Sequence, residues 1–210
     1  MAESHLPEDK FGLDRVVFFS DAVIAIAITL LVLELKVPEI EPNLVGAELT
    51  QRVLALWPNY LGFFTSFWVI GMYWVTHHRM FRYIQGYDQG LLLINLWVLF
   101  FIALMPFPTA LLFRYPAQWI SVLAYAGTIL AIGLTKAALW RYATHRHRLV
   151  APTLPPRLIR SMSISILATP AVFLLSIILA FFNAEWAMYS WLLVLPLYFY
   201  YRPARQAAGA

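Results

Sequence analysis

The polar residues that could do chemistry in this chain lie within or beside long apolar stretches. Ser20 and Asp21 are adjacent near the start of one such stretch, which runs on to Leu35. A central Asp costs about 2.5–3.5 kcal/mol on membrane-insertion scales, so a carboxylate there marks a candidate functional site. Two interpretations are open, and they are compatible. Asp21 belongs to a buried network that locks helices together, with Arg15 or His77 as its partner, or it forms part of a gating or permeation element.

A second group of candidates is the pair His77 and His78, at the polar end of another apolar stretch. Two His ligands for a metal on one helix usually stand at positions i and i+4, whereas adjacent positions point about 100° apart. We therefore expect no metal site. We expect His77 to join the Asp21 cluster, with Asn95 from a third stretch. Asn95 can equally form an ordinary interhelical hydrogen bond.

Motifs of the common enzyme classes are absent from the sequence. It has no glycine-rich phosphate loop, no His-Glu-x-x-His and no nucleophile elbow. We therefore expect no enzymatic activity and no cofactor. The Thr-Val-Gly-Tyr-Gly filter of ordinary potassium channels is also missing, so any ion conduction must use side chains rather than a carbonyl filter.

The composition is that of an integral membrane protein. Of the 210 residues, 61% are hydrophobic and only 12% are charged, against about 25% charged residues in soluble proteins. The chain contains no cysteine, which excludes disulfides and thiolate metal sites. The acidic N-terminal segment lacks the features of a cleavable signal peptide.

Six stretches approach the length of about 20 apolar residues that a membrane-spanning helix needs. We expect one all-α domain over residues 1–210, with transmembrane helices at about 15–36, 54–76, 89–113, 117–140, 160–182 and 186–201.

The basic residues fall mainly on one side of these six helices, the side that holds both termini. Because Lys and Arg accumulate in cytoplasmic loops, both termini should be cytoplasmic. The basic excess is then a topological signal and a contact for anionic lipid rather than for nucleic acid. The basic residues on this side are Lys10, Arg15, Arg79, Arg82, Lys136, Arg141, Arg146, Arg148, Arg157, Arg160, Arg202 and Arg205, against Lys36, Arg52 and Arg114 opposite.

Four residues after the Ser-Asp pair share one face of the first helix. Ile26, Thr29, Leu30 and Leu33 follow the i, i+3, i+4, i+7 spacing, and Asp21 lies about 140° around the helix from Ile26. By spacing alone, these aliphatic side chains simply meet lipid or a neighbouring helix. Thr29 by the same reasoning bonds its own i−4 carbonyl.

The first helix resembles the signature of the transmembrane protein 175 family, cation channels of bacteria and lysosomes. Similar segments follow at residues 73–79 and 102–109. A single copy of six helices resembles the bacterial form, which is a homotetramer, whereas the animal form carries two such units. The residues that carry the signature are Arg15, Phe19, Ser20, Asp21, Ala22, Val23, Ala25, Ile26, Ala27 and Thr29.

This resemblance assigns roles along the first helix, which lines the pore of each family member. It implies that Ile26 forms the hydrophobic constriction, that Leu30 and Leu33 form further apolar rings, and that Thr29 contributes to potassium preference. The residues it assigns to the network that fixes the pore helix are Arg15, Phe19, Ser20, Asp21, His77 and Asn95.

The function implied is passive conduction of potassium, with a moderate preference over sodium, by a homotetramer in the bacterial inner membrane. A narrow ring of Ile26 side chains would close such a pore by excluding water. Two alternatives stay open. One is a proton-coupled transporter that uses Asp21 and His77 as a relay, and the other is a membrane scaffold without transport.

Overall fold

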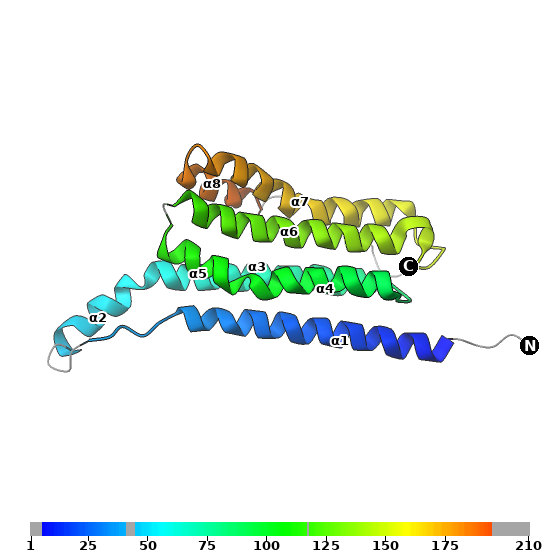
Figure 1. The fold of residues 1–210 in the computed structure, drawn as a ribbon, viewed down its shortest axis with the longest axis horizontal. Coiled ribbons are helices and arrows are strands. Elements are labelled where there is room, and N and C mark those ends of the chain that lie inside the picture. The colour runs from blue at the N-terminus through cyan, green and yellow to red at the C-terminus, as the bar shows by residue number, and fades with distance from the viewer. Residues whose placement is uncertain (1–5, 41–44, 117, 195–210) are drawn as a thin grey trace, which may run out of the picture.

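A computed structural model of the chain describes residues 6–40, 45–116 and 118–194 (Figure 1). The elements of this part of the chain are helices joined by loops. Its longer helices lie side by side along one axis, and the shorter elements occupy their ends. The elements are α1 (Leu6–Leu30), η1 (Leu31–Glu34), α2 (Val45–Ala55), α3 (Trp57–Phe81), α4 (Gln89–Leu104), α5 (Pro106–Arg114), α6 (Trp119–Thr144), η2 (His145–His147), α7 (Pro156–Ala180), α8 (Ala184–Ser190) and η3 (Trp191–Leu193).

The first five expected segments correspond to long helical stretches, with shifted ends. α1 begins at Leu6 rather than at residue 15, and α3 continues to Phe81, so that His77 lies within the helix. The third segment divides into α4 and α5 at Met105, because Pro106 and Pro108 lack the N–H groups that would continue the helical ladder. The sixth segment, residues 186–201, begins in α8 and η3, and its remainder lies outside the described residues.

Within the described residues, four helical stretches are long and apolar enough to cross a membrane: Phe11–Glu34, Gln89–Arg114, Trp119–His147 and Pro156–Ala180. α3 has the same 25-residue length as α7. Its Asn, Tyr, Trp, His and Arg side chains make it more polar. The described part of the chain is thus a helical, multi-pass membrane protein.

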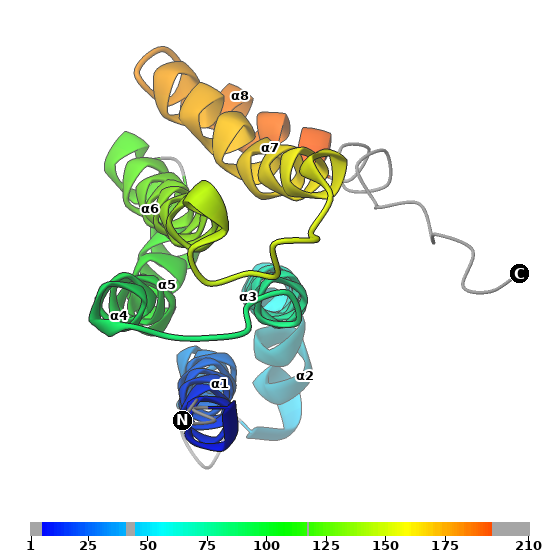
Figure 2. The same ribbon diagram turned by 90° about the vertical axis from the view of Figure 1, so that its right-hand side faces the viewer.

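α6 is the central helix of the bundle. It packs against α4 and α5 on one side and α7 on the other, while α1 packs against α3 and α4 at the edge (Figure 2). α6 and α7 approach closely where Gly133 meets the ring of Pro170, and a Cβ at position 133 would overlap that ring. Only glycine permits this approach.

Lys136, counted above with the basic residues of the cytoplasmic side, is buried inside the bundle. It is 2% exposed, since it lies on the inner side of α6 well before the helix ends. Its ammonium group donates to the Tyr73 carbonyl oxygen at 2.9 Å and to Thr76 Oγ1, and it lies 5.1 Å from the centre of the Tyr73 ring. These α3 groups replace the water that a buried cation lacks.

One carboxylate joins the start of α4 to the end of α6. Asp88 accepts hydrogen bonds from the Leu91 N–H at 2.8 Å, from the Tyr142 hydroxyl at 3.0 Å and from Arg148 Nε at 2.9 Å. Partial burial acts to raise the pKa of Asp88, but these hydrogen bonds and the Arg148 charge outweigh it and leave the pKa below its usual value. The ionised carboxylate is therefore the form that the fold stabilises.

Replacing Asp88 by Ala should lower the free energy of unfolding at neutral pH by about 0.5–2 kcal/mol, the usual cost of losing an N-cap. Because the pKa of Asp88 is depressed in the folded state, its charge-dependent stabilisation is complete above the unfolded value of about 3.9. It is lost as the pH falls through the lower folded pKa. Unfolding of the detergent-purified protein, followed by tryptophan fluorescence against pH, measures both effects. Asp88→Asn, which keeps an N-cap acceptor, should lose less, and identical stability of all three proteins at pH 7 would contradict this role.

Candidate functional site

One face of α1 is buried within the subunit. Ser20, Ile24, Ala27 and Leu31 recur at intervals of four, three and four residues, and none is more than 1% exposed. This spacing places them on a single helical face, and α1 packs against α3 and α4. The packing fixes which residues of α1 face outward.

The opposite face of α1 has no covering partner within the described chain. Ile26 is 58% exposed and Leu33 is 66% exposed. Ala22 is exposed one turn before Ile26, Thr29 is exposed between Ile26 and Leu33, and Leu30 lies at the margin. α1 runs along the edge of the bundle (Figure 1), so this face is open along most of its length. The residues expected at the constriction, Ile26, Leu30 and Leu33, are thus among those that the subunit leaves free to meet lipid, a pore or another copy.

Thr29 places a hydroxyl on the exposed face. Its Oγ1 donates to the Ile26 carbonyl oxygen at 2.8 Å, three residues back rather than the expected four. The single hydroxyl proton is therefore used within the helix, while the oxygen lone pairs remain available. Such an oxygen can accept a hydrogen bond from water or contact a cation.

Ser20 and Asn95 are brought together across the interface between α1 and α4. Asn95 Nδ2 donates to Ser20 Oγ at 2.9 Å, and Ser20 Oγ donates to the Val16 carbonyl oxygen at 2.8 Å. Both side chains are buried. The pair links α4 to the backbone of α1 through a short chain of hydrogen bonds.

Asp21 has a different partner from the two that were expected. Its carboxylate accepts a hydrogen bond from Trp74 Nε1 of α3 at 2.8 Å. Arg15 precedes Asp21 by six residues and so lies about 120° away around α1, where its side chain is exposed. The sequence offered one signal for Trp74: an indole N–H is a donor that needs an acceptor in an apolar environment.

His77 makes no hydrogen bond to either of these pairs. It is 1% exposed, and its ring centre lies 4.6 Å from that of Phe81. Neither ring nitrogen has a hydrogen-bond partner among the described residues. Phe19, also expected in the network, is 53% exposed on α1. The described hydrogen bonds join Ser20 to Asn95 and Asp21 to Trp74, and none of them links all six expected network residues.

Further buried hydroxyl groups join α3, α5 and α6. Thr109 Oγ1 donates to the Met105 carbonyl oxygen at 2.7 Å and lies 3.2 Å from Ser66 Oγ, which is 3.4 Å from the Tyr125 hydroxyl. Ser and Thr are common in membrane helices, so the sequence alone carries no signal for this cluster. The cluster packs α3, the helix that carries Trp74, against α5 and α6.

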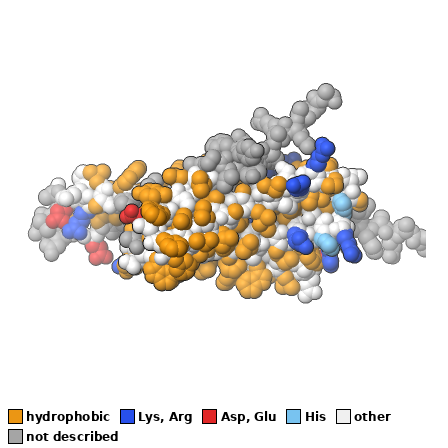
Figure 3. Space-filling view, turned by 90° about the horizontal axis from the view of Figure 1, so that it is seen from above, with side chains coloured by type: hydrophobic (Ala, Val, Ile, Leu, Met, Phe, Trp, Pro, Cys, Tyr) orange, Lys and Arg blue, Asp and Glu red, His pale blue; other side chains and the backbone are white. Residues whose placement is uncertain are grey.

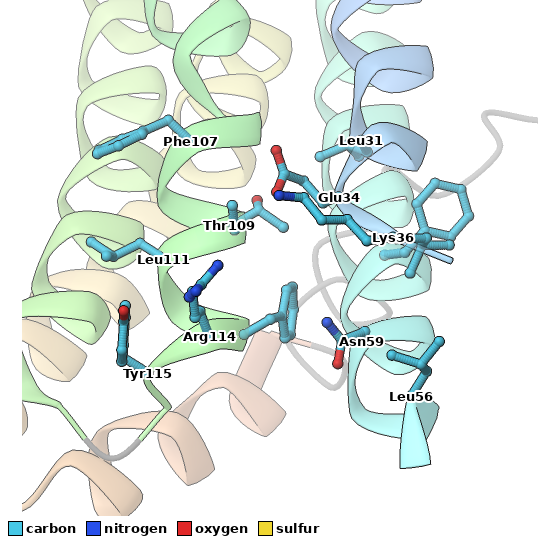
Figure 4. A pocket seen from close by; sticks show the side chains of 14 residues that line it. Leu31, Glu34, Lys36, Leu56, Asn59, Phe107, Thr109, Leu111, Arg114 and Tyr115 are labelled. Carbon is cyan, nitrogen blue, oxygen red and sulfur yellow. The ribbon is translucent and has the colours of Figure 1, made fainter. Parts of the chain in front are cut away.

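A cavity of about 440 Å³ opens between η1, α3 and α5, at the end of the bundle away from the N-terminus (Figure 4). Charged side chains of both signs line it, among them Glu34, Lys36 and Arg114. Among the described residues there is no group of three or more His, Cys, Asp or Glu side chains suited to a metal ion. The cavity lies beside the end of the α1 helix.

Comparison with known proteins gives consistent matches. A family model described as the endosomal/lysosomal potassium channel TMEM175 matches residues 15–106. A potassium channel of Chamaesiphon minutus is 38% identical over 189 residues, which cover 88% of this chain and 92% of the relative. A potassium channel of Streptomyces collinus is 36% identical over 174 residues, which cover 81% and 83%.

A solved structure extends the match to three dimensions. The crystal structure of a lysosomal potassium-selective channel TMEM175 homolog from Chamaesiphon minutus superposes with a TM-score of 0.76 at 33% identity, covering 90% of this chain and 98% of that one. Identity at this level across nearly the whole of both chains shows common descent. The chain belongs to the TMEM175 family.

Proposed function

We propose that this chain is a subunit of a potassium channel, with the exposed face of α1 lining the pore. The carrying observation is that Ile26 and Thr29 of α1 and Leu33 of η1 lie on a face that the subunit leaves open, while the opposite face is buried. The relatives named as potassium channels support the choice of ion. No bound cofactor is needed, because potassium itself is the transported species.

The proposed pore lies on an axis between copies of the chain. α1 stands at the edge of the bundle (Figure 2), so its open face cannot enclose a path within one subunit. Four copies that turn this face toward a common axis would bring four Ile26 side chains into a ring. A homotetramer therefore gives a closed pore and removes a large apolar surface from lipid.

The proposed gate works through wetting of the apolar neck. A narrow ring of Ile26 side chains excludes water and therefore ions, with further rings at Leu30 and Leu33. Thr29 would supply a polar oxygen between these rings. The pairs Ser20–Asn95 and Asp21–Trp74 hold α1 against α3 and α4, so a small movement of α1 would be transmitted from those helices.

The proposed orientation places both termini in the cytoplasm of a bacterial cell, with the chain in the inner membrane. Lys and Arg side chains gather at the end of the molecule near the N-terminus, whereas the surface between the two ends is mostly hydrophobic (Figure 3). We call this end the basic end. The positive-inside rule assigns it to the cytoplasm, and the burial of Lys136 leaves the loop arginines as the main signal.

The purified protein in liposomes should pass potassium down its gradient. Reversal potentials under opposed potassium and sodium gradients should follow potassium, and a pH gradient alone should drive no potassium movement, because conduction through a pore is passive. A fluorescent flux assay or a bilayer recording measures this. Uptake that requires a proton gradient would favour the relay of Asp21 and His77, and absence of flux would favour a scaffold.

Ile26→Asn should raise potassium conductance severalfold, because a polar ring keeps the neck wet. Val32→Asn is the matched control, since Val32 is exposed but lies about 120° around η1 from Leu33, at three residues per turn, and it should leave conductance unchanged. Single-channel recording of both variants checks the prediction. Equal effects of the two substitutions would remove Ile26 from the constriction.

Trp74→Phe should destabilise the protein by about 1.5–3 kcal/mol, the range for hydrogen bonds to charged groups, because it leaves Asp21 without its indole donor. Trp68→Phe, at an exposed position of the same helix, should cost less. A double-mutant cycle with Asp21→Ala, read by thermal unfolding in detergent, isolates the pair. Additive effects of the two substitutions would show that the hydrogen bond contributes nothing.

A further inference from the structure

A groove with a cavity of about 460 Å³ lies between α6 and α7 at the basic end. It begins beyond the close approach of Gly133 and Pro170, where the two helices are in tight contact. On α7 its lining runs from Ile159 to Leu167, about 12 Å along the axis at 1.5 Å per residue. The groove therefore reaches from the end of the bundle well into its apolar zone.

The deep part of the groove has apolar walls. Ala137 and Ala138 line it from α6, and Leu167 lines it from α7. The small alanine side chains leave width between the helices. Ala138 and Leu167 are also exposed at the surface, so the groove opens sideways toward the region that lipid occupies.

The rim of the groove carries charge of one sign. Arg141 and His145 are its charged or ionisable lining residues, and both are exposed. Neither side chain makes a hydrogen bond or ion pair with another residue in the described part of the chain. No acidic residue lines this groove, in contrast to the cavity that contains Glu34.

The neutral polar groups of the groove are already engaged within the protein. Trp140 Nε1 and Ser163 Oγ both donate to the Ile159 carbonyl oxygen, at 3.2 Å and 2.9 Å. Thr144 Oγ1 donates to the Trp140 carbonyl oxygen at 2.7 Å. The donors left for a ligand are therefore those of Arg141 and His145, at the mouth.

We propose that this groove binds an anionic phospholipid of the adjacent leaflet. Its phosphate contacts the Arg141 guanidinium and the His145 ring at the rim, and one acyl chain lies against Ala137, Ala138 and Leu167. A basic pocket between membrane helices on the cytoplasmic side suits an acidic headgroup. The apolar depth selects a lipid over a free anion. This site lies across the bundle from the proposed pore face and does not depend on ion selectivity.

Titration of the detergent-purified protein with phosphatidylglycerol tests the proposal, with thermal unfolding as the readout. Phosphatidylglycerol should raise the unfolding midpoint in a saturable way, and phosphatidylcholine with the same chains should not. Soluble glycerol phosphate, which lacks the acyl chains, should also have no effect. Equal effects of the two lipids, or an equal effect of glycerol phosphate, would overturn the proposal.

Matched variants locate the lipid. Arg141→Gln should weaken the apparent affinity for phosphatidylglycerol about fivefold, the contribution of one basic residue near an anionic surface. Ala138→Trp should weaken it by filling the groove without changing charge. Arg82→Gln removes an exposed arginine of the same end that does not line the groove and should leave affinity unchanged. An equal loss in Arg82→Gln, or none in Ala138→Trp, would assign binding to diffuse surface charge instead.

Discussion

The rotation of α1 about its own axis is the constraint on which the proposed pore depends. In an apolar interior, a polar side chain without a partner carries a large free-energy cost. Ser20 avoids this cost in the observed orientation of α1, in which its hydroxyl accepts a hydrogen bond from Asn95 and donates one to the Val16 carbonyl oxygen. A turn of one residue, about 100°, would break the first contact and bring Ile24 out of the core. The hydrogen bond and the packing therefore select the same orientation.

Asp21 acts on the same helix from another direction. Its carboxylate lies about 140° from Ile26 and accepts a hydrogen bond from Trp74 on α3. Lys136 of α6 donates to the carbonyl oxygen of Tyr73 on α3. Tyr73 is the residue before Trp74. The costly polar groups thus form links between α1, α3 and α6. The Ser-Asp pair positions the helix, which leaves the apolar residues of the open face free for the proposed conduction path.

The regularity of α1 made its faces predictable, whereas partners from distant segments were not. The spacing of Ile26, Thr29 and Leu33 already placed them together, and the structure leaves that face open. Their role as a constriction rested on the family resemblance, because spacing alone also fits contact with lipid. Trp74 lies 53 residues from Asp21, and only the packing of two helices identifies such a pair. The burial of Lys136 was not predicted, because the sequence does not say which side of α6 faces inward.

Cysteine accessibility tests directly whether the open face of α1 lines the conduction path. The chain has no native cysteine, so single substitutions introduce the only thiol. Currents of Ile26→Cys, Thr29→Cys and Leu33→Cys should be blocked by a small water-soluble thiol reagent, and those of Val32→Cys and Ala27→Cys should not. Block at Val32 or Ala27 without block at Ile26 would place the ion path on another surface and contradict the account.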